Sequence, residues 1–263
     1  MKKLIFFLLA LTIAFAGCKK DKDDDETVDE AFNKITITKT QEAFVMLTTA
    51  TWCTYCGQWG IPTFDEAFAG ESGIDANKVN GAALHYSGSD PMHLTMSETL
   101  KTEFGIGGPP NLWIEFDNSY NLQPDGWKSA VKARQSGTNP SCAVGLYKEN
   151  DGSNIKVYAK VKFYSTLSGT YNLAIYVTES GIIESQTGST TPNNHDHKEV
   201  LRGEVTANSP WGVQMFTGSS PEEFTKEFSY TPSGVDVSNI KFVAVVYKMD
   251  NGKPIESTNS NSL

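Results

Sequence analysis

The sequence is poor in cysteine and in positive charge, and both shortages exclude classes of function. Its 263 residues include only four cysteines, and 22 Lys and Arg stand against 31 Asp and Glu, which gives a formal net charge of −9. An acidic surplus argues against nucleic acid and against anionic lipid headgroups as partners. The sequence contains no Ser-His-Asp order, phosphate-binding loop or paired-carboxylate pattern, and we expect no cofactor.

Long apolar runs are also missing, apart from one at the N-terminus. Residues 4–16 form an apolar stretch of 13 residues behind two lysines, too short to span a bilayer as a helix and typical of a signal peptide. Residues 15–18, Phe-Ala-Gly-Cys, resemble a bacterial lipobox with Phe in place of the usual Leu. We therefore predict a lipoprotein signal peptide over residues 1–17 and a lipid on Cys18 that anchors the protein in a membrane. An ordinary secretory signal with an incidental cysteine is the alternative.

Residues 18–33 open with a dense run of Lys, Asp and Glu. Such a segment cannot bury apolar area and predicts an acidic, disordered tether. An acidic run directly after a lipidated cysteine also resembles the export signal of Bacteroidota lipoproteins that reach the outer face of the outer membrane. The resemblance implies a lipid-anchored outer-membrane protein exposed on the cell surface, with the periplasmic face as the alternative.

Two of the remaining cysteines lie in one motif, Trp-Cys-Thr-Tyr-Cys at residues 52–56, which follows an apolar run and opens a predicted helix. Unpaired N–H groups in the first turn of a helix favour negative charge, so the thiol of Cys53 ionises more easily there. Two intervening residues allow Cys56 to close a small disulfide ring. A zinc site usually needs a second Cys or His pair, and there is no second Cys-x-x-Cys. A purely structural disulfide remains an alternative.

This strand, motif and helix resemble thioredoxin, and the resemblance extends to residues 104–114, Phe-Gly-Ile-Gly-Gly-Pro-Pro-Asn-Leu-Trp-Ile. It implies that Pro110 is the cis-proline that packs beside the disulfide in that family. The site residues implied are Trp52, Cys53, Cys56 and Pro110.

The sequence departs from thioredoxin at two positions that matter for activity. Leu47 stands where the family has a buried acid, so the usual proton acceptor is missing. Pro109, the residue before the expected cis-proline, has no N–H to donate to a bound partner. The fold prediction survives both departures, whereas the activity stays open.

The chain divides into two predicted halves. Alternation predicts an opening strand at residues 35–38, and the order of strands and helices predicts an α/β thioredoxin-like domain over residues 34–136 that includes a hairpin near residues 112–122. Beyond a linker at residues 137–140, only strands follow, which predicts an all-β sandwich domain over residues 141–263. Each half is large enough for its own core.

The second half carries a more specific resemblance. Residues 176–186, 195–202 and the Trp-Gly pair at 211–212 resemble the family related to outer membrane protein 28 (Omp28), Bacteroidota surface lipoproteins with a thioredoxin-like domain followed by a sandwich. The likeness covers almost all of the mature chain. Members are commonly described as surface receptors or adhesins, so the resemblance implies a host or matrix ligand and establishes no chemistry.

Three further residues invite a functional interpretation. His195 and His197 alternate along the chain, so on a strand they share a face and are candidates for one metal ion, but no third ligand is in view and a polar loop is the alternative. Cys142 shares a predicted strand face with apolar residues and is expected to be a buried, inert thiol.

Two functions therefore remain. In the first, Cys53 is the nucleophile and Cys56 the resolving thiol of a protein that exchanges disulfides with thiol or disulfide protein partners. In the second, the protein is a non-catalytic receptor or adhesin with a structural disulfide. The intact motif favours the first, and Leu47 and Pro109 favour the second. We expect a redox-capable domain in a surface lipoprotein whose role is binding or assembly.

Overall fold

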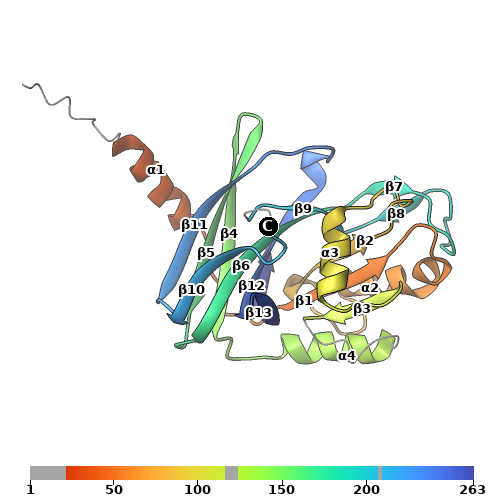
Figure 1. The fold of residues 1–263 in the computed structure, drawn as a ribbon, viewed down its shortest axis with the longest axis horizontal. Coiled ribbons are helices and arrows are strands. Elements are labelled where there is room, and N and C mark those ends of the chain that lie inside the picture. Colours follow the sequence, from red (N-terminus) through yellow and green to blue (C-terminus); the bar gives the residue numbers. More distant parts are fainter. Residues whose placement is uncertain (1–21, 116–123, 207–208) are drawn as a thin grey trace, which may run out of the picture.

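A computed structural model describes residues 22–115, 124–206 and 209–263 (Figure 1). The predicted signal peptide, Cys18, the first residues of the tether and the middle of the predicted 112–122 hairpin lie outside the described residues. The helices are α1 (Lys22–Asn33), α2 (Ile61–Phe68), α3 (Thr95–Glu103) and α4 (Pro124–Gln135), with short helical turns η1 (Cys56–Gly60), η2 (Ala76–Lys78) and η3 (Val237–Asn239). The strands are β1 (Ala43–Thr49), β2 (Val79–His85), β3 (Asn111–Ile114), β4 (Cys142–Asp151), β5 (Asn154–Phe163), β6 (Ser168–Glu179), β7 (Ile182–Glu184), β8 (His195–His197), β9 (Val200–Glu204), β10 (Val213–Ser219), β11 (Glu223–Tyr230), β12 (Ile240–Asp250) and β13 (Lys253–Ser262).

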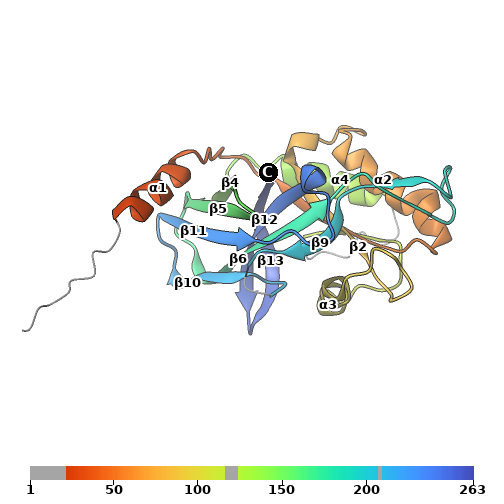
Figure 2. The same ribbon diagram turned by 90° about the horizontal axis from the view of Figure 1, so that it is seen from above.

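The first half has the thioredoxin-like order that the motifs predict. β1 lies between β2, to which it is parallel, and β3, to which it is antiparallel. α2 and α4 cover one face of this part of the sheet and α3 lies on the other (Figure 2). Successive side chains of a strand point to opposite faces, so Val45 and Leu47 pack with α2 and α4, while Phe44 and Met46 pack on the side of α3.

The second half consists almost entirely of antiparallel strands. β4, β5 and β11 form a three-stranded sheet in the order β11-β5-β4, while β12 pairs with both β6 and β13. Apolar side chains from both sheets meet in one core cluster, which includes Val157, Val161, Leu173, Ile175 and Phe242. The strand-rich second half is thus confirmed. Its larger sheet continues into the first half, so a separate sandwich domain is not confirmed.

One sheet runs through both halves of the chain. Its strand order is β13-β12-β6-β9-β2-β1-β3, and β10 also pairs with β6. β9 makes the junction: it pairs with the end of β6, and Val200 faces Ala83 of β2 in a parallel pair. The 137–140 segment therefore connects two halves that share a sheet, although each half also has a core cluster of its own.

The halves also share a hydrophobic core beside α3. Phe44 of β1 stacks on Tyr176 of β6 with ring centroids 5.9 Å apart, and Leu84, Leu201 and Val245 are buried in the same cluster. Apolar area buried at this junction stabilises the pairing by roughly 25 cal/mol per Å². We infer that each half, taken alone, would expose apolar side chains that the other half buries.

Two predicted N-terminal segments differ from the structure. Lys22–Asn33 forms α1, although the disordered tether was expected to reach residue 33. The end of α1 carries apolar side chains: Ala31 is buried, and the ring of Phe32 lies 5.5 Å from that of Tyr158 on β5. Residues 35–38 run along β4 without forming the predicted strand.

Candidate disulfide site and its surroundings

β1 delivers the Cys-x-x-Cys motif to the start of a helix, as the sequence predicts. Cys53 and Cys56 form a disulfide with their Cα atoms 5.2 Å apart. Cys56 is fully buried, whereas Cys53 keeps 6 % of its surface exposed, so Cys53 is the sulfur that a partner can approach. Two aromatic side chains of the motif are exposed: Trp52, directly before Cys53, at 47 %, and Tyr55, between the two cysteines, at 64 %.

The helix after the motif begins with a π-turn, η1, in which the N–H of Ile61 donates to the carbonyl oxygen of Cys56. Pro62 follows in the first turn of α2 and has no N–H to donate. A π-turn accommodates one extra residue in a helix and is frequent at functional sites. α2 then begins directly after the π-turn, so that Pro62 lies in its first turn, where a missing N–H leaves no helical hydrogen bond unmade.

The bond between Pro109 and Pro110 is cis, as the resemblance to thioredoxin predicts. Pro110 lies against the motif helix, because a Cβ on Gly60 would meet the Pro110 ring. Pro109 is half-buried and offers no backbone donor. Leu47 is fully buried in the core that contains both motif cysteines, so the family's buried acid is replaced by an apolar side chain.

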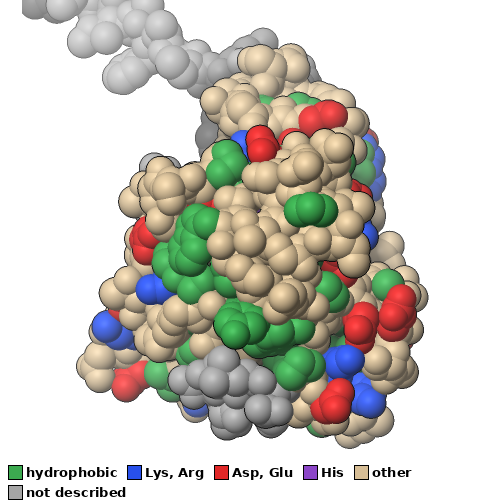
Figure 3. Space-filling model, turned by 90° about the vertical axis from the view of Figure 1, so that its right-hand side faces the viewer, with side chains coloured by type: hydrophobic (Ala, Val, Ile, Leu, Met, Phe, Trp, Pro, Cys, Tyr) green, Lys and Arg blue, Asp and Glu red, His purple; other side chains and the backbone are tan. Residues whose placement is uncertain are grey.

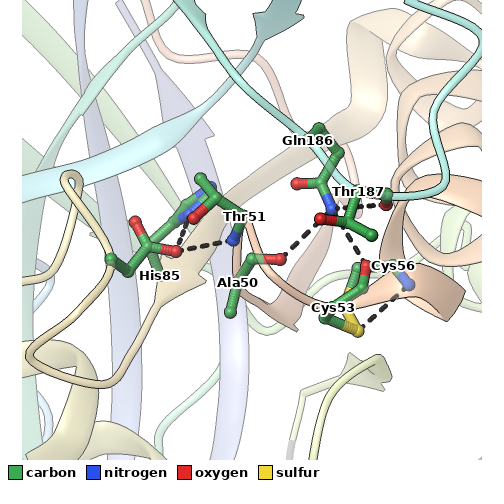
Figure 4. Close-up of a disulfide and its surroundings, with 8 residues drawn as sticks. Ala50, Thr51, Cys53, Cys56, His85, Gln186 and Thr187 are labelled. Carbon is green, nitrogen blue, oxygen red and sulfur yellow. Dashed lines mark hydrogen bonds and ion pairs between the residues drawn. A yellow bond between two sulfur atoms is a disulfide. The ribbon is translucent and has the colours of Figure 1, made fainter. Parts of the chain in front are cut away.

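A loop from the second half of the chain closes over the motif, and the sequence analysis missed it. We call residues 186–189, between β7 and β8, the strap. Gln186 is fully buried, and its Nε2 donates to the carbonyl oxygens of Ala50 (3.2 Å) and Cys53 (3.0 Å). The N–H of Thr187 donates to the carbonyl oxygen of Thr51 over 2.8 Å (Figure 4).

The strap contacts the motif backbone directly. Gly188 has a φ of +82°, and a Cβ there would collide with the carbonyl oxygen of Thr54. Glycine is thus required both by the backbone conformation and by the close approach. The signal that sequence reasoning could have used is a Gln-Thr-Gly turn between two short strands, but nothing in it names the partner segment.

Asp90 supports the other side of the motif. Its Oδ2 accepts hydrogen bonds from the N–H of Thr51 (2.8 Å) and from Nδ1 of His85 (3.1 Å), and its Oδ1 accepts from the N–H of Met92 (2.8 Å). Burial by itself would raise the pKa of the Asp90 carboxyl, but these hydrogen bonds hold it below its usual value. A buried ionised carboxylate with three donors fixes the backbone just before Trp52.

Three of the four histidines of the chain gather beside this support. The rings of His85 and His197 lie 5.2 Å apart, and those of His195 and His197 lie 4.7 Å apart, so the predicted shared face of the two β8 histidines is confirmed. Burial, and then the neighbouring His85 and His195, lower the pKa of His197 to about 3. Burial also lowers the pKa of His195.

A metal centre does not follow from this grouping. Nδ1 of His195 lies 2.8 Å from Oγ of Ser189 in the strap. Within the described parts of the chain, no group of three or more His, Cys, Asp or Glu side chains is placed to hold a metal ion. Cys142 is buried, and burial raises the pKa of its thiol to about 12, in line with the inert thiol expected.

The side of the molecule on which α2, β7 and β8 lie in Figure 1 carries several groups of apolar side chains among uncharged polar side chains and backbone, and most Lys, Arg, Asp and Glu side chains lie toward the edges of this view (Figure 3). Among the described helices, none is long and apolar enough to cross a membrane.

Comparison with known proteins gives a fold and no family. No family model matches the chain, and no curated protein matches it. Among solved structures, HBP35 of Porphyromonas gingivalis superposes with a TM-score of 0.71 at 16 % identity, over 87 % of this chain and 76 % of that one. A domain of the outer membrane lipoprotein Omp28 from the same organism aligns over 47 % of this chain and 92 % of that one, at 19 % identity.

The Omp28 domain superposes with a TM-score of only 0.29, so no structural argument rests on it. The likeness to HBP35 extends across both halves and includes the thioredoxin-like part. Both neighbours come from one bacterium of the phylum Bacteroidota, in line with the predicted resemblance to Omp28-related proteins, and what HBP35 shares with this chain is the fold.

Proposed function

We propose that the protein is a lipid-anchored outer-membrane protein whose Cys53–Cys56 pair exchanges disulfides with partner proteins. The observation that carries the proposal is the asymmetry of the pair. Cys53 reaches the surface at a helix start and Cys56 is fully buried behind it. A thiolate at the first turn of a helix is stabilised, and the buried thiol of Cys56 can attack only Sγ of Cys53.

The exchange proceeds in two displacements. A thiolate of the partner attacks Sγ of Cys53, the Cys53–Cys56 bond breaks, and the electron pair leaves on Sγ of Cys56, which then takes up a proton. The second thiolate of the partner then attacks the partner sulfur of the mixed disulfide. This forms a disulfide within the partner and releases the thiolate of Cys53. The partner dithiol is thereby oxidised, and two electrons are stored in the Cys53 and Cys56 thiols. Repeated turnover requires a second protein whose disulfide accepts the two electrons. In the reverse reaction, which reduces a partner disulfide, the thiolate of Cys53 attacks that disulfide, Cys56 resolves the mixed disulfide, and a second dithiol protein reduces the pair again.

The anchor part of the proposal rests on the N-terminal sequence. The apolar leader, the lipobox-like residues 15–18 and the acidic run after them support a lipid on Cys18 and an outer-membrane location.

A second function is favoured by the strap and by the two departures from thioredoxin. Gln186 and Thr187 tie the backbone around Cys53, Leu47 provides no proton acceptor, and Pro109 provides no donor. These features suit a receptor or adhesin in which the disulfide is structural and the second half binds a host or matrix ligand.

The reduction potential of the Cys53–Cys56 pair separates the two functions. Equilibration of the purified protein in glutathione buffers, with alkylation of free thiols and mass spectrometry, measures it directly. Exchange predicts a potential above about −300 mV, because exchanging disulfides are more oxidising than structural ones. A potential below about −300 mV makes the disulfide structural and leaves the binding function.

A further inference from the structure

A cavity of about 550 Å³ opens in the second half of the chain, in a part of the molecule separate from the disulfide. It lies where the start of β6 meets the β12–β13 turn and the segment before β10. Pockets that hold small-molecule ligands have volumes of roughly 300–1,000 Å³. Its lining includes the side chains of Asn172, Trp211, Gln214, Asp250 and Asn251.

The wall combines one large aromatic ring with neutral hydrogen-bonding groups. Trp211 contributes a half-buried indole, and Asn172, Gln214 and Asn251 contribute carboxamides, each with two donors and an acceptor oxygen. Asp250 is the one charged residue among the described residues of the wall, so an anionic ligand is disfavoured. Within the described residues, the side chain of Gln214 has no hydrogen-bond partner and is free to bind a ligand.

The segment that carries Trp211 is held rigidly against the sheet. The hydroxyl of Tyr176 donates to the carbonyl oxygen of Pro210 over 2.6 Å, and Nδ2 of Asn172 donates to the carbonyl oxygen of Trp211 over 3.1 Å. Gly212, with a φ of +68°, lies so close to β6 that a Cβ would collide with the carbonyl oxygen of Leu173. The indole is therefore positioned before any ligand arrives.

The ring itself is fixed by aromatic neighbours. It packs edge-to-face against Phe104, with ring centroids 5.3 Å apart, and against Tyr247, with centroids 6.2 Å apart. The opposite wall is also ordered, because Nδ2 of Asn251 donates to Oδ2 of Asp250 over 3.2 Å in the β12–β13 turn. Rigid groups lose little conformational entropy on binding, so such a wall favours affinity.

We propose that this cavity is a binding site for a neutral saccharide, with a sugar ring against Trp211 and its hydroxyls bonded to the surrounding carboxamides and to Asp250. The apolar C–H face of a pyranose is complementary to an indole, which presents a flat apolar surface with a polar N–H at one edge. Sugar hydroxyls both donate and accept, which matches carboxamides and a carboxylate and needs no cationic group. The wall contains no Lys, Arg or His for an anionic group among its described residues.

The test is isothermal titration of the purified protein with three neutral oligosaccharides: maltohexaose, mannohexaose and chitohexaose. Saturable binding of at least one is expected. Gln214→Ala should weaken that binding about threefold to tenfold, since one hydrogen bond is lost. Trp211→Ala should weaken it at least about tenfold, since the stacking surface is lost.

Two controls keep the outcome decisive. Trp52→Ala removes a more exposed indole that lies outside the cavity wall and should leave binding unchanged. Because Trp211 packs against core aromatics, its variant is interpreted only with an unchanged melting temperature, whereas Gln214 is exposed and its variant does not disturb the fold. The proposal is overturned by the absence of binding of all three sugars at about 10 mM, ten times the ligand needed for half-saturation at millimolar affinity, or by binding that Gln214→Ala leaves intact.

Discussion

Gln186 donates a hydrogen bond from Nε2 to the carbonyl oxygen of Cys53 over 3.0 Å, across 133 residues of sequence. The bond places a side chain from the second half of the chain inside the motif that defines the first. A second bond from the same nitrogen reaches Ala50. The disulfide site is therefore built by both halves, and removing this one amide tests how much the strap contributes.

Gln186→Leu should destabilise the protein by about 1–3 kcal/mol, because the carbonyl oxygens of Ala50 and Cys53 each lose one of their donors while the shape of the side chain is nearly kept. The strap should also loosen, so that after reduction Cys53 reacts faster with iodoacetamide than in the natural protein. Urea denaturation and alkylation kinetics measure the two effects.

Asn193→Ala, at an exposed position of the same loop, is the matched control and should change neither quantity. Unchanged stability in Gln186→Leu would show that the hydrogen bonds between the strap and the motif do not stabilise the protein.

The site was predictable from the sequence only where it is local. The Cys-x-x-Cys spacing marks a disulfide at a helix start, because it depends on neighbouring residues, and the resemblance of residues 104–114 to thioredoxin marks Pro110 as the cis-proline. The strap and the Asp90 support are contacts between distant segments. Polar residues in a turn have many partners available, and the sequence does not say which partner they meet.

The linker at residues 137–140 provides a prediction about how the halves hold together. Residues 136–139 are exposed, so limited proteolysis should cut there. The two pieces should then remain associated in gel filtration, because β9 joins β6 to β2 and a common core surrounds Tyr176. Adding about 6 M urea should separate them, since denaturant exposes the shared apolar surface. Elution of the C-terminal piece alone under native conditions would instead mean two independent domains.

The last strand of the long sheet, β13, was hidden from sequence analysis for a physical reason. β13 is almost entirely polar, so it lacks the alternation that marks β12. Its buried Asn259 donates to the carbonyl oxygen of Cys142 (2.8 Å), and Asn261 donates to that of Val144 (2.8 Å). Side-chain amides here replace apolar packing, and β4 is thereby tied to the long sheet.

His197 predicts a pH dependence of stability. Its pKa is lowered by burial to about 3, whereas an exposed histidine titrates near 6.5, so the unfolded chain binds the proton more tightly than the folded one. Stability should therefore fall as pH drops below about 6.5, by up to roughly 2 kcal/mol at pH 5 for this residue.

The difference in unfolding free energy between the natural protein and His197→Gln, measured from pH 7.5 to 5, isolates this contribution from that of other groups. The difference should shrink as the pH falls, because the variant has no proton to bind. A constant difference for His197→Gln would mean that the His197 site becomes protonated without cost.

Anchoring is predicted by the N-terminal sequence alone. Cys18→Ser should move the protein from the detergent phase to the aqueous phase of a Triton X-114 extraction, because the acyl chains that hold it in the membrane are lost. Mass spectrometry of the natural N-terminus should show a lipid on Cys18. Detergent partition that persists in the variant, without an attached lipid, would contradict the lipoprotein assignment.

The last prediction concerns the order in which the two motif cysteines react. After mild reduction, Cys53 should be alkylated faster than Cys56 at neutral pH, because it lies at the helix start and keeps 6 % of its surface exposed while Cys56 has none. Cys142 serves as an internal control and should remain unmodified, because burial raises the pKa of its thiol to about 12. Leu47 provides no carboxylate to accept the proton from Cys56, so a mixed disulfide on Cys53 should be resolved slowly. Cys56→Ser should consequently trap disulfide-linked partners only modestly better than the natural protein, and Cys53→Ser should trap none. Insulin reduction by the natural protein should be weak beside thioredoxin, since Pro109 also withholds a backbone donor from the partner. If Cys56 is alkylated first, or if Cys53→Ser traps as many partners as Cys56→Ser, then Cys53 is not the attacking sulfur and the exchange mechanism is wrong.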